Sequence, residues 1–220
     1  MSDRVLHLVR HGRSDMSSTT MIETPRGPQW DPPLDEHGRE QALRVSLRLA
    51  LLEPPPAAVY CSPLRRTRET VAPYAERSGL EVRFDDDLME ANIGAWEGKP
   101  FEEIVASDED ILPLIRASRA IWSRAPGGES FDAFQGRVRR AIDGILERHP
   151  DGDVVVICHG GVINAYLGPL LGIRQEMFFI PENTSVSSVE LDERGARVRF
   201  LNDILHLTDP QLFGDVAPRD

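Results

Sequence analysis

The chain has 220 residues, of which 40% are hydrophobic and 28% are charged, proportions that are ordinary for a soluble globular protein. Its formal net charge of -11 at pH 7 argues against a nucleic-acid partner, because binding nucleic acid requires a basic surface. No stretch approaches the roughly 20 apolar residues of a membrane span, and the N-terminus lacks an apolar signal core. We therefore expect one cytoplasmic domain over residues 1–220, with no membrane partner.

The first predicted element is a short strand at Val5–Val9, where four of five residues are apolar and two are β-branched. It ends abruptly at Arg10, His11 and Gly12. In open α/β sheets, ligands bind beyond the carboxyl ends of the strands, which would place these residues in a site. A strand end that leaves its polar residues in water is the alternative.

The next segment reads as a polar, proline-containing loop of about twenty residues, a length that is usually functional or disordered in a compact domain. Because this loop leaves directly from the first strand end, we expect it to form part of the wall of the site, with Arg13, Arg26 and Trp30. A scaffold helix capped near Asp35 follows. Its expected apolar face consists of Ala42, Leu43, Leu47, Leu51 and Leu52.

A second short strand is predicted at 57–61. Ser62, a serine able to cap a helix, and Pro63 in the first turn then mark a helix N-terminus, a position that attracts anions. Arg65 and Arg66 point about 100° apart on a helix, so we expect one of them to face the crevice. Arginine in a first turn is disfavoured by the helix dipole, so its presence there indicates a functional role. The alternative is a basic turn that is exposed to solvent.

The middle of the chain contains a third strand at 80–84 and an irregular, glycine-punctuated segment at 88–98. Glu90 and Glu97 in that segment are candidate carboxylates for the site, although surface glutamates would look the same. Residues 101–122 predict one or two helices that form a small cap, and this cap is a candidate to line the pocket. An amphipathic helix is expected at 131–146.

A second histidine strand follows, because the β-branched run 153–158 ends in His159-Gly160-Gly161 and repeats the design of the first. Two buried strands that each deliver a histidine at the same end predict two imidazoles over one crevice. Beyond a helix at 162–171 we expect a hairpin of strands 186–191 and 197–201, then a polar tail. Cys61 and Cys158 read as small core residues, since two cysteines form neither a disulfide framework nor a zinc cluster.

Two histidines and two arginines at one crevice would form a cationic nest, and its natural ligand is a phosphoryl group. A neutral imidazole there can attack phosphorus covalently, while the arginines hold the equatorial oxygens. The leaving alkoxide needs a proton, for which a carboxylic acid such as Glu90 is a suitable donor.

Four motifs in sequence resemble the signatures of the histidine phosphatase superfamily, in its phosphoglycerate mutase-like branch 1. They are Leu8-Val9-Arg10-His11-Gly12-Arg13-Ser14, Ser62-Pro63-Leu64-Arg65-Arg66-Thr67, Leu88-Met89-Glu90 with Gly94-Ala95-Trp96-Glu97-Gly98, and His159-Gly160-Gly161. The match spans roughly residues 4 to 191. The resemblance implies an α/β fold, a three-layer α/β/α sandwich with a mostly parallel central sheet.

Residue by residue, the resemblance implies that His11 is the phosphorylated nucleophile and Glu90 the proton donor. Arg10, Arg66 and His159 would clamp the phosphate. Further phosphate or substrate contacts are expected from Ser14, Gly160, Arg13, Arg26 and Asn183. No metal and no cofactor are expected.

Within this family we expect a phosphatase that acts on a small phosphorylated metabolite. Glycolytic mutases typically carry a tryptophan-asparagine pair after the serine, where this chain has Asp15 and Met16, and they have a longer insertion after Glu90. Mutase-type phosphoryl transfer, a metallohydrolase and a catalytically idle phospho-ligand-binding module are the alternatives. An edge strand or an exposed helix would allow a homodimer.

Overall fold

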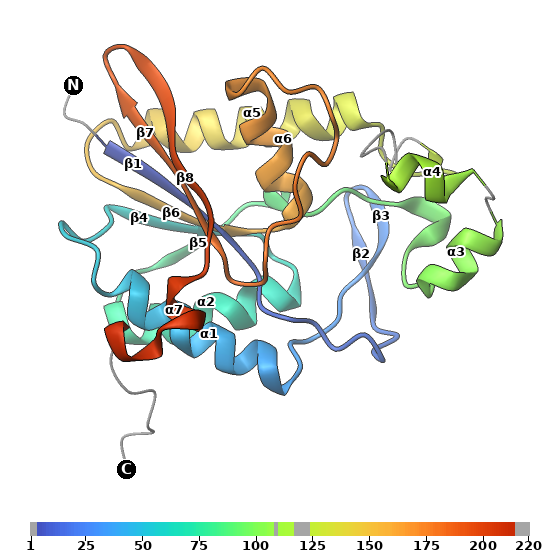
Figure 1. Cartoon of the computed structure of the whole chain (residues 1–220), viewed down its shortest axis with the longest axis horizontal. Coiled ribbons are helices and arrows are strands. Elements are labelled where there is room, and N and C mark those ends of the chain that lie inside the picture. The colour runs from blue at the N-terminus through green and yellow to red at the C-terminus, as the bar shows by residue number, and fades with distance from the viewer. Residues whose placement is uncertain (1–3, 108–109, 117–123, 214–220) are drawn as a thin grey trace.

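The structure is a computed structural model that describes residues 4–107, 110–116 and 124–213. A six-stranded sheet with the order β5–β4–β6–β1–β7–β8 forms its centre (Figure 1). The strands are β1 (Arg4–Arg10), β4 (Ala58–Cys61), β5 (Val82–Phe84), β6 (Val154–Cys158), β7 (Val186–Asp192) and β8 (Gly195–Asp203). Strands β5, β4, β6 and β1 are parallel, whereas β7 runs antiparallel to β1 and β8. The predicted, mostly parallel sheet is confirmed.

Alternation along β1 explains how both faces of the sheet are covered. Leu6 and Leu8 belong to the buried cluster that includes residues of α5 (Phe131–Arg148) and α6 (Gly160–Leu170). Val9 belongs to the cluster on the other face, with residues of α1 (Glu36–Leu49) and α2 (Arg65–Ser78). Each fully buried valine or leucine contributes roughly 1.5–3 kcal/mol of hydrophobic stabilisation. Figure 1 shows these helix pairs on opposite sides of the sheet, which is the predicted three-layer sandwich.

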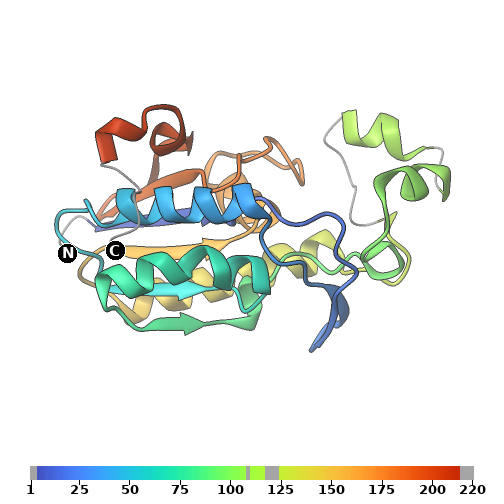
Figure 2. The same cartoon turned by 90° about the horizontal axis from the view of Figure 1, so that it is seen from below.

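The segment predicted as a loop after β1 contains a hairpin of two short strands, β2 (Met21–Thr24) and β3 (Gly27–Trp30). The predicted cap contains the short helices α3 (Phe101–Ser107) and α4 (Ile111–Arg116), and its residues 108–109 and 117–122 lie outside the described part. Figures 1 and 2 place the hairpin and these helices at one end of the molecule, beyond the carboxyl ends of the parallel strands. Two 3₁₀ turns, η1 (Asp86–Leu88) and η2 (Gly94–Trp96), border the same region.

Two local predictions were wrong. Asp35 caps α1 as expected, with its Oδ1 accepting a hydrogen bond from the Gly38 amide at 2.7 Å, but the buried face of the helix differs from the predicted one. Leu43 and Leu51 are 40% and 59% exposed, because α1 ends at residue 49 and buries smaller and polar side chains instead. Likewise, α2 begins after Leu64 without a side-chain cap, so Ser62 does not cap this helix.

The predicted polar tail is partly helical. It contains α7 (Leu205–Thr208) and a 3₁₀ turn, η4 (Pro210–Phe213), which pack against α1. Across the described ranges, no helix is both long and apolar enough to span a membrane.

His206 on α7 is fully buried and connects this C-terminal segment to the loop before β7. Its Nε2 lies 3.1 Å from the Thr184 hydroxyl, and its Nδ1 lies 3.4 Å from a guanidinium nitrogen of Arg48. Burial, with the nearby Arg48 charge as the next cause, lowers the pKa of His206 to about 4. The Thr184 amide in turn donates to the His11 carbonyl at 3.2 Å. The C-terminal segment therefore supports the strand end that carries His11.

This burial predicts a loss of stability in acid. Above about pH 6.5, His206 is neutral in both the folded and the unfolded chain, and its contribution is fully present. As the pH falls from 6.5 toward 4, the unfolded chain binds a proton that the folded protein excludes, so the free energy of unfolding drops by up to ~3 kcal/mol. Urea midpoints measured between pH 7.5 and 4.5 should therefore vary less in His206→Gln than in the wild type. If the urea midpoint of His206→Gln changes with pH as much as that of the wild type, the prediction is wrong. The matched control is His37→Gln, at an exposed histidine of α1.

Candidate active site

The pairing of β1 with β6 brings the two predicted histidines together. Arg10 lies opposite Cys158 in this parallel register, so His11 and His159 leave neighbouring strands at the same level. Their ring centroids are 5.2 Å apart, and both residues are buried. The prediction of two imidazoles at one strand end is confirmed.

The hydrogen bonds of His11 fix which ring nitrogen is free. Its Nδ1 lies 2.7 Å from the Gly12 carbonyl, an acceptor, so Nδ1 carries the proton and the other nitrogen, Nε2, has the lone pair. The backbone here is tightly enclosed, because a Cβ on Gly12 would lie 2.6 Å from the Gly38 carbonyl oxygen of α1. Asn183 Nδ2 also donates to the His11 carbonyl, at 3.0 Å. These contacts hold the imidazole in one tautomer and one position.

Ser62 orients the second ring. Its hydroxyl oxygen lies 2.8 Å from His159 Nε2 and accepts a long hydrogen bond of 3.4 Å from the Leu64 amide. The serine proton is thus available to Nε2, which leaves the proton of His159 on Nδ1. That buried Nδ1 has no hydrogen-bond partner among the residues that the structure describes. It can therefore donate to a bound anion.

Two arginines border the histidines. Arg66, in the first turn of α2, is buried and donates from Nη1 to the Trp30 carbonyl at 3.1 Å. Arg10 donates from Nη1 to the Pro181 carbonyl, and its buried Nε finds no hydrogen-bond partner in the described part of the chain. Arg65 instead pairs with Glu69 at 2.7 Å on the exposed side of α2, so only one arginine of this pair faces the crevice, as predicted.

The surroundings keep both imidazoles neutral. Burial lowers the pKa of His11 well below its usual value, and the positive charges of Arg66 and then Arg10 lower it further. For His159, burial is again the main cause of a lowered pKa, followed by Arg66. A neutral imidazole next to guanidinium groups combines a nucleophilic lone pair with donors that match phosphate oxygens.

Glu90 brings a carboxylate to the same place. Its Oε1 accepts a hydrogen bond from the Ala91 amide at 3.0 Å, and its Oε2 accepts one from the Gly161 amide at 2.9 Å. A Cβ on Gly161 would lie 2.2 Å from the Glu90 Oε1 atom. The second glycine after His159 is therefore required by the close approach of this carboxylate.

A cavity of about 340 Å³ lies over these groups. Most predicted site residues line it, namely Arg10, His11, Arg13, Ser14, Arg66, Glu90 and Asn183. His159 and Gly160 are not among the lining residues, although the His159 ring lies tilted beside that of His11. A larger groove of about 800 Å³ between α1 and α2 contains neither histidine.

Two expectations about the lining are not met. Arg26 is not among the lining residues, because its guanidinium is bound to Asp87 Oδ1 at 3.1 Å and to the Asp86 carbonyl. No described residue of the cap helices α3 and α4 lines the cavity either.

Other lining residues went unrecognised in the sequence, namely Met16, Gln29, Ala91 and Ile93, whereas Trp30 lines the cavity as expected. Glu97 was the second candidate carboxylate. Its two oxygens accept hydrogen bonds from backbone amides, from Ile93 at 2.9 Å and from Trp30 at 2.8 Å. Burial raises the pKa of Glu97. Because Trp30 in turn binds Arg66, Glu97 helps to place that arginine.

Among the described residues, no group of three or more His, Cys, Asp or Glu side chains is arranged to hold a metal ion.

The chain is similar to known proteins along most of its length. The chain is 30% identical over 205 residues to phosphoserine phosphatase 1 of Hydrogenobacter thermophilus, covering 92% of this chain and 93% of that protein. It is 28% identical over 214 residues to the probable phosphoglycerate mutase GpmB of Shigella dysenteriae serotype 1, covering 94% and 96%. The chain spans 40% of the length of several longer mycobacterial relatives.

Among solved structures, a mycobacterial glucosyl-3-phosphoglycerate phosphatase in complex with inorganic phosphate superimposes with a TM-score of 0.77 at 27% identity, covering 93% of this chain and 99% of that one. The sequence model of the histidine phosphatase superfamily (branch 1) matches residues 6–204. The relatives are thus phosphatases and mutases, and the predicted resemblance is confirmed. The chain belongs to the histidine phosphatase superfamily, branch 1.

Proposed function

We propose that this protein is a phosphatase that hydrolyses a small phosphomonoester through a phosphohistidine intermediate on His11. The proposal rests on the residues that line the cavity. A neutral, tautomer-fixed imidazole, that of His11, lines a cavity that is also lined by the guanidinium groups of Arg10 and Arg66 and by the Glu90 carboxyl group. This set contains a nucleophile, a clamp for the transferred phosphoryl group and a proton donor.

In the first step, His11 Nε2 attacks phosphorus, a P–N bond forms and the P–O bond to the leaving group breaks. Glu90 gives its proton to the leaving oxygen and becomes a carboxylate. In the second step, this carboxylate takes a proton from a water molecule, whose oxygen attacks phosphorus and breaks the P–N bond. Inorganic phosphate leaves, and both His11 and Glu90 return to their starting states.

The non-bridging oxygens would be held by Arg10, Arg66 and the Nδ1–H group of His159. Because these donors are already fixed by the fold, they need little reorganisation as charge moves in the transition state. We propose that no metal and no cofactor take part, since the guanidinium groups supply the positive charge that a cation would bring. Ser14 and Asn183, which line the cavity, and Gly160 and Arg13 would make further substrate contacts.

The substrate is proposed to be a small phosphorylated metabolite. Relatives named as phosphoserine phosphatase and glucosyl-3-phosphoglycerate phosphatase support hydrolysis, and the cavity of about 340 Å³ suits a small molecule. The relative named as a probable phosphoglycerate mutase makes phosphoryl return to substrate the second candidate. Release of inorganic phosphate, as opposed to formation of an isomeric phosphate ester, separates the two activities.

His11→Ala should abolish turnover, by at least about a thousandfold in kcat, because the residue that accepts the phosphoryl group is gone. The assay is release of inorganic phosphate from a panel of phosphorylated metabolites, and rapid quench with labelled substrate should trap acid-labile phosphate on His11 of the wild type. The exposed His37 of α1 supplies the control His37→Ala, which should remain active. Full activity of His11→Ala would refute the proposal.

Glu90→Gln should lower kcat/KM for alkyl phosphates by about 10²–10⁴-fold, because a poor leaving group needs a proton as it departs. With p-nitrophenyl phosphate, whose leaving group is stable as an anion, the same variant should lose little kcat/KM, because this parameter reports phosphoryl transfer to His11 and not the later attack of water, in which Glu90 is the base. Plotting kcat/KM against the acidity of the leaving alcohol measures this difference. Equal losses for all leaving groups would remove Glu90 from the role of acid.

Arg66→Gln should raise the pKa of His11, because the nearby positive charge disfavours the imidazolium ion. In the wild type, the lowered pKa keeps His11 neutral well below pH 6.5, so kcat/KM should show no acid limb near that pH. An NMR titration of histidine-labelled, phosphate-free protein reports the His11 pKa directly. The prediction fails if the titration of His11 is the same in both proteins.

A further inference from the structure

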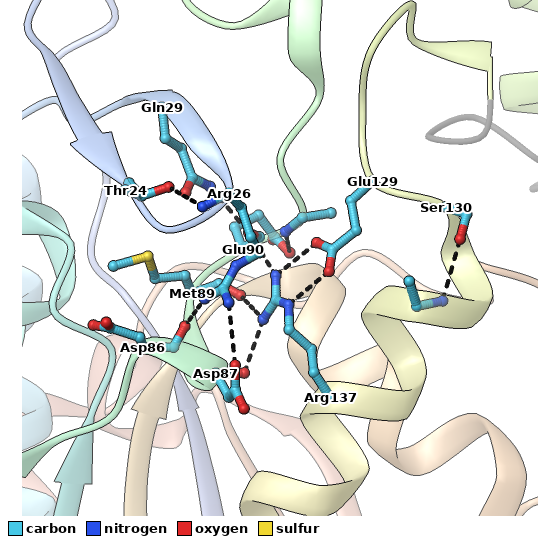
Figure 3. Close-up of polar contacts among 12 residues, drawn as sticks. Thr24, Arg26, Gln29, Asp86, Asp87, Met89, Glu90, Glu129, Ser130 and Arg137 are labelled. Carbon is cyan, nitrogen blue, oxygen red and sulfur yellow. Dashed lines mark hydrogen bonds and ion pairs between the residues drawn. The ribbon is translucent and has the colours of Figure 1, made fainter.

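The buried ion pair of Glu129 and Arg137 lies next to the site but outside the cavity lining (Figure 3). Their side chains are 11% and 5% exposed. Arg137 Nε and Nη2 donate to the two Glu129 carboxylate oxygens, each at 2.8 Å, which is the forked geometry that arginine forms with a carboxylate. Removing two charges from water is costly, so such a pair is weak evidence for stability as such.

The rest of this guanidinium holds the backbone of the segment that carries Glu90. Nη1 donates to the Asp87 and Met89 carbonyls, both at 2.8 Å, and Nη2 donates to the Glu90 carbonyl at 3.1 Å. These three bonds and the two to Glu129 use all five N–H groups of one arginine. Figure 3 shows the dashed contacts fanning from the Arg137 guanidinium to this segment and to Glu129.

The segment needs these donors because it has no regular secondary structure to satisfy its carbonyls. After η1 ends at Leu88, residues 89–93 belong to no helix or strand. Buried carbonyl groups without a partner are costly, and Arg137 on the rigid helix α5 supplies donors at fixed positions.

Opposite Arg137, the β2–β3 hairpin fastens the same segment. Gln29 Nε2 donates to the Glu90 carbonyl at 2.9 Å, and Arg26 binds Asp87 and the Asp86 carbonyl. The Glu90 backbone is thus gripped between the hairpin and α5, while its carboxyl group accepts the Ala91 and Gly161 amides. A displacement of about 1 Å in such a catalytic group can cost about a hundredfold in rate.

We propose that the Glu129–Arg137 pair is a positioning device that sets the Glu90 carboxyl group against the leaving oxygen of the substrate. This rests on the proposed function, in which Glu90 is the acid. Arg137 acts through Glu90 and does not touch the substrate.

Arg137→Lys tests the proposal, because lysine keeps the positive charge but has no planar fork and too few donors to hold Glu129 and three carbonyls together. The kcat/KM for alkyl phosphates should fall by about 30-fold or more, whereas kcat/KM for p-nitrophenyl phosphate should stay within about threefold of the wild type. The dependence of kcat/KM on leaving-group acidity should therefore steepen, as in Glu90→Gln. In the double variant Glu90→Gln/Arg137→Lys, the second change should add little.

Glu129→Gln is the milder second variant, since it keeps the volume and one oxygen acceptor for Arg137. It should also steepen the dependence of kcat/KM on leaving-group acidity, but by less. If Arg137→Lys does not fold, this variant tests the positioning role alone. Arg139→Gln is the matched control on the same helix, because Arg139 is exposed and pairs only with Asp143 among the described residues. This control should behave like the wild type.

The positioning role is overturned if Arg137→Lys and Glu129→Gln lose activity equally for all leaving groups while Glu90→Gln still steepens the dependence on leaving-group acidity. The proposed function would then stand. If Glu90→Gln itself shows no leaving-group dependence, the acid assignment fails, and the positioning role fails with it. A steepened dependence in Glu90→Gln and in both pair variants supports both.

Discussion

The parallel pairing of β1 with β6 is the constraint on which the site depends. This register places Arg10 opposite Cys158, and each strand then delivers one histidine at the same sheet edge, with ring centroids 5.2 Å apart. A slip of one residue would turn every side chain of a strand to the other face of the sheet, so the pair would be lost. The hydrophobic alternation of β1, which buries Leu6 and Val9 in opposite clusters, resists such a slip.

Burial then determines the chemistry that these histidines offer. Two arginines close to two imidazoles would repel any imidazolium, and the low polarity of the surroundings disfavours it further, so both rings stay neutral. Keeping the buried imidazoles neutral lowers the free energy of unfolding in acid. The same interior location favours polar groups that are hydrogen-bonded to the backbone or to another side chain, which explains the dense contacts around His11 and Glu90. Arg10 Nε and His159 Nδ1 are exceptions, and they are the donors proposed to bind the anion.

Much of this was predictable from the sequence, because it is encoded in local patterns. Apolar runs that end in Arg-His-Gly and His-Gly-Gly predict the strands and their shared end, and the motif order predicts the family. The hairpin β2–β3 was missed because its short strands, interrupted by Pro28, carry little alternation. The link between Glu129 and Arg137, and the support of Thr184 by His206, arise from contacts that only the folded chain creates. No periodicity in the sequence reports which backbone carbonyls a buried arginine will bind.

We propose that His11, His159, Arg10 and Arg66 bind one tetrahedral phosphoryl group, with the leaving oxygen toward Glu90. A crystal structure of the protein with orthovanadate, which mimics the five-coordinate transition state, tests this arrangement. We expect vanadium bonded to His11 Nε2, equatorial oxygens on the two guanidinium groups and on His159 Nδ1, and the apical oxygen opposite the imidazole next to Glu90. Vanadate bound elsewhere, or bound in this cavity without a bond to His11, would contradict it.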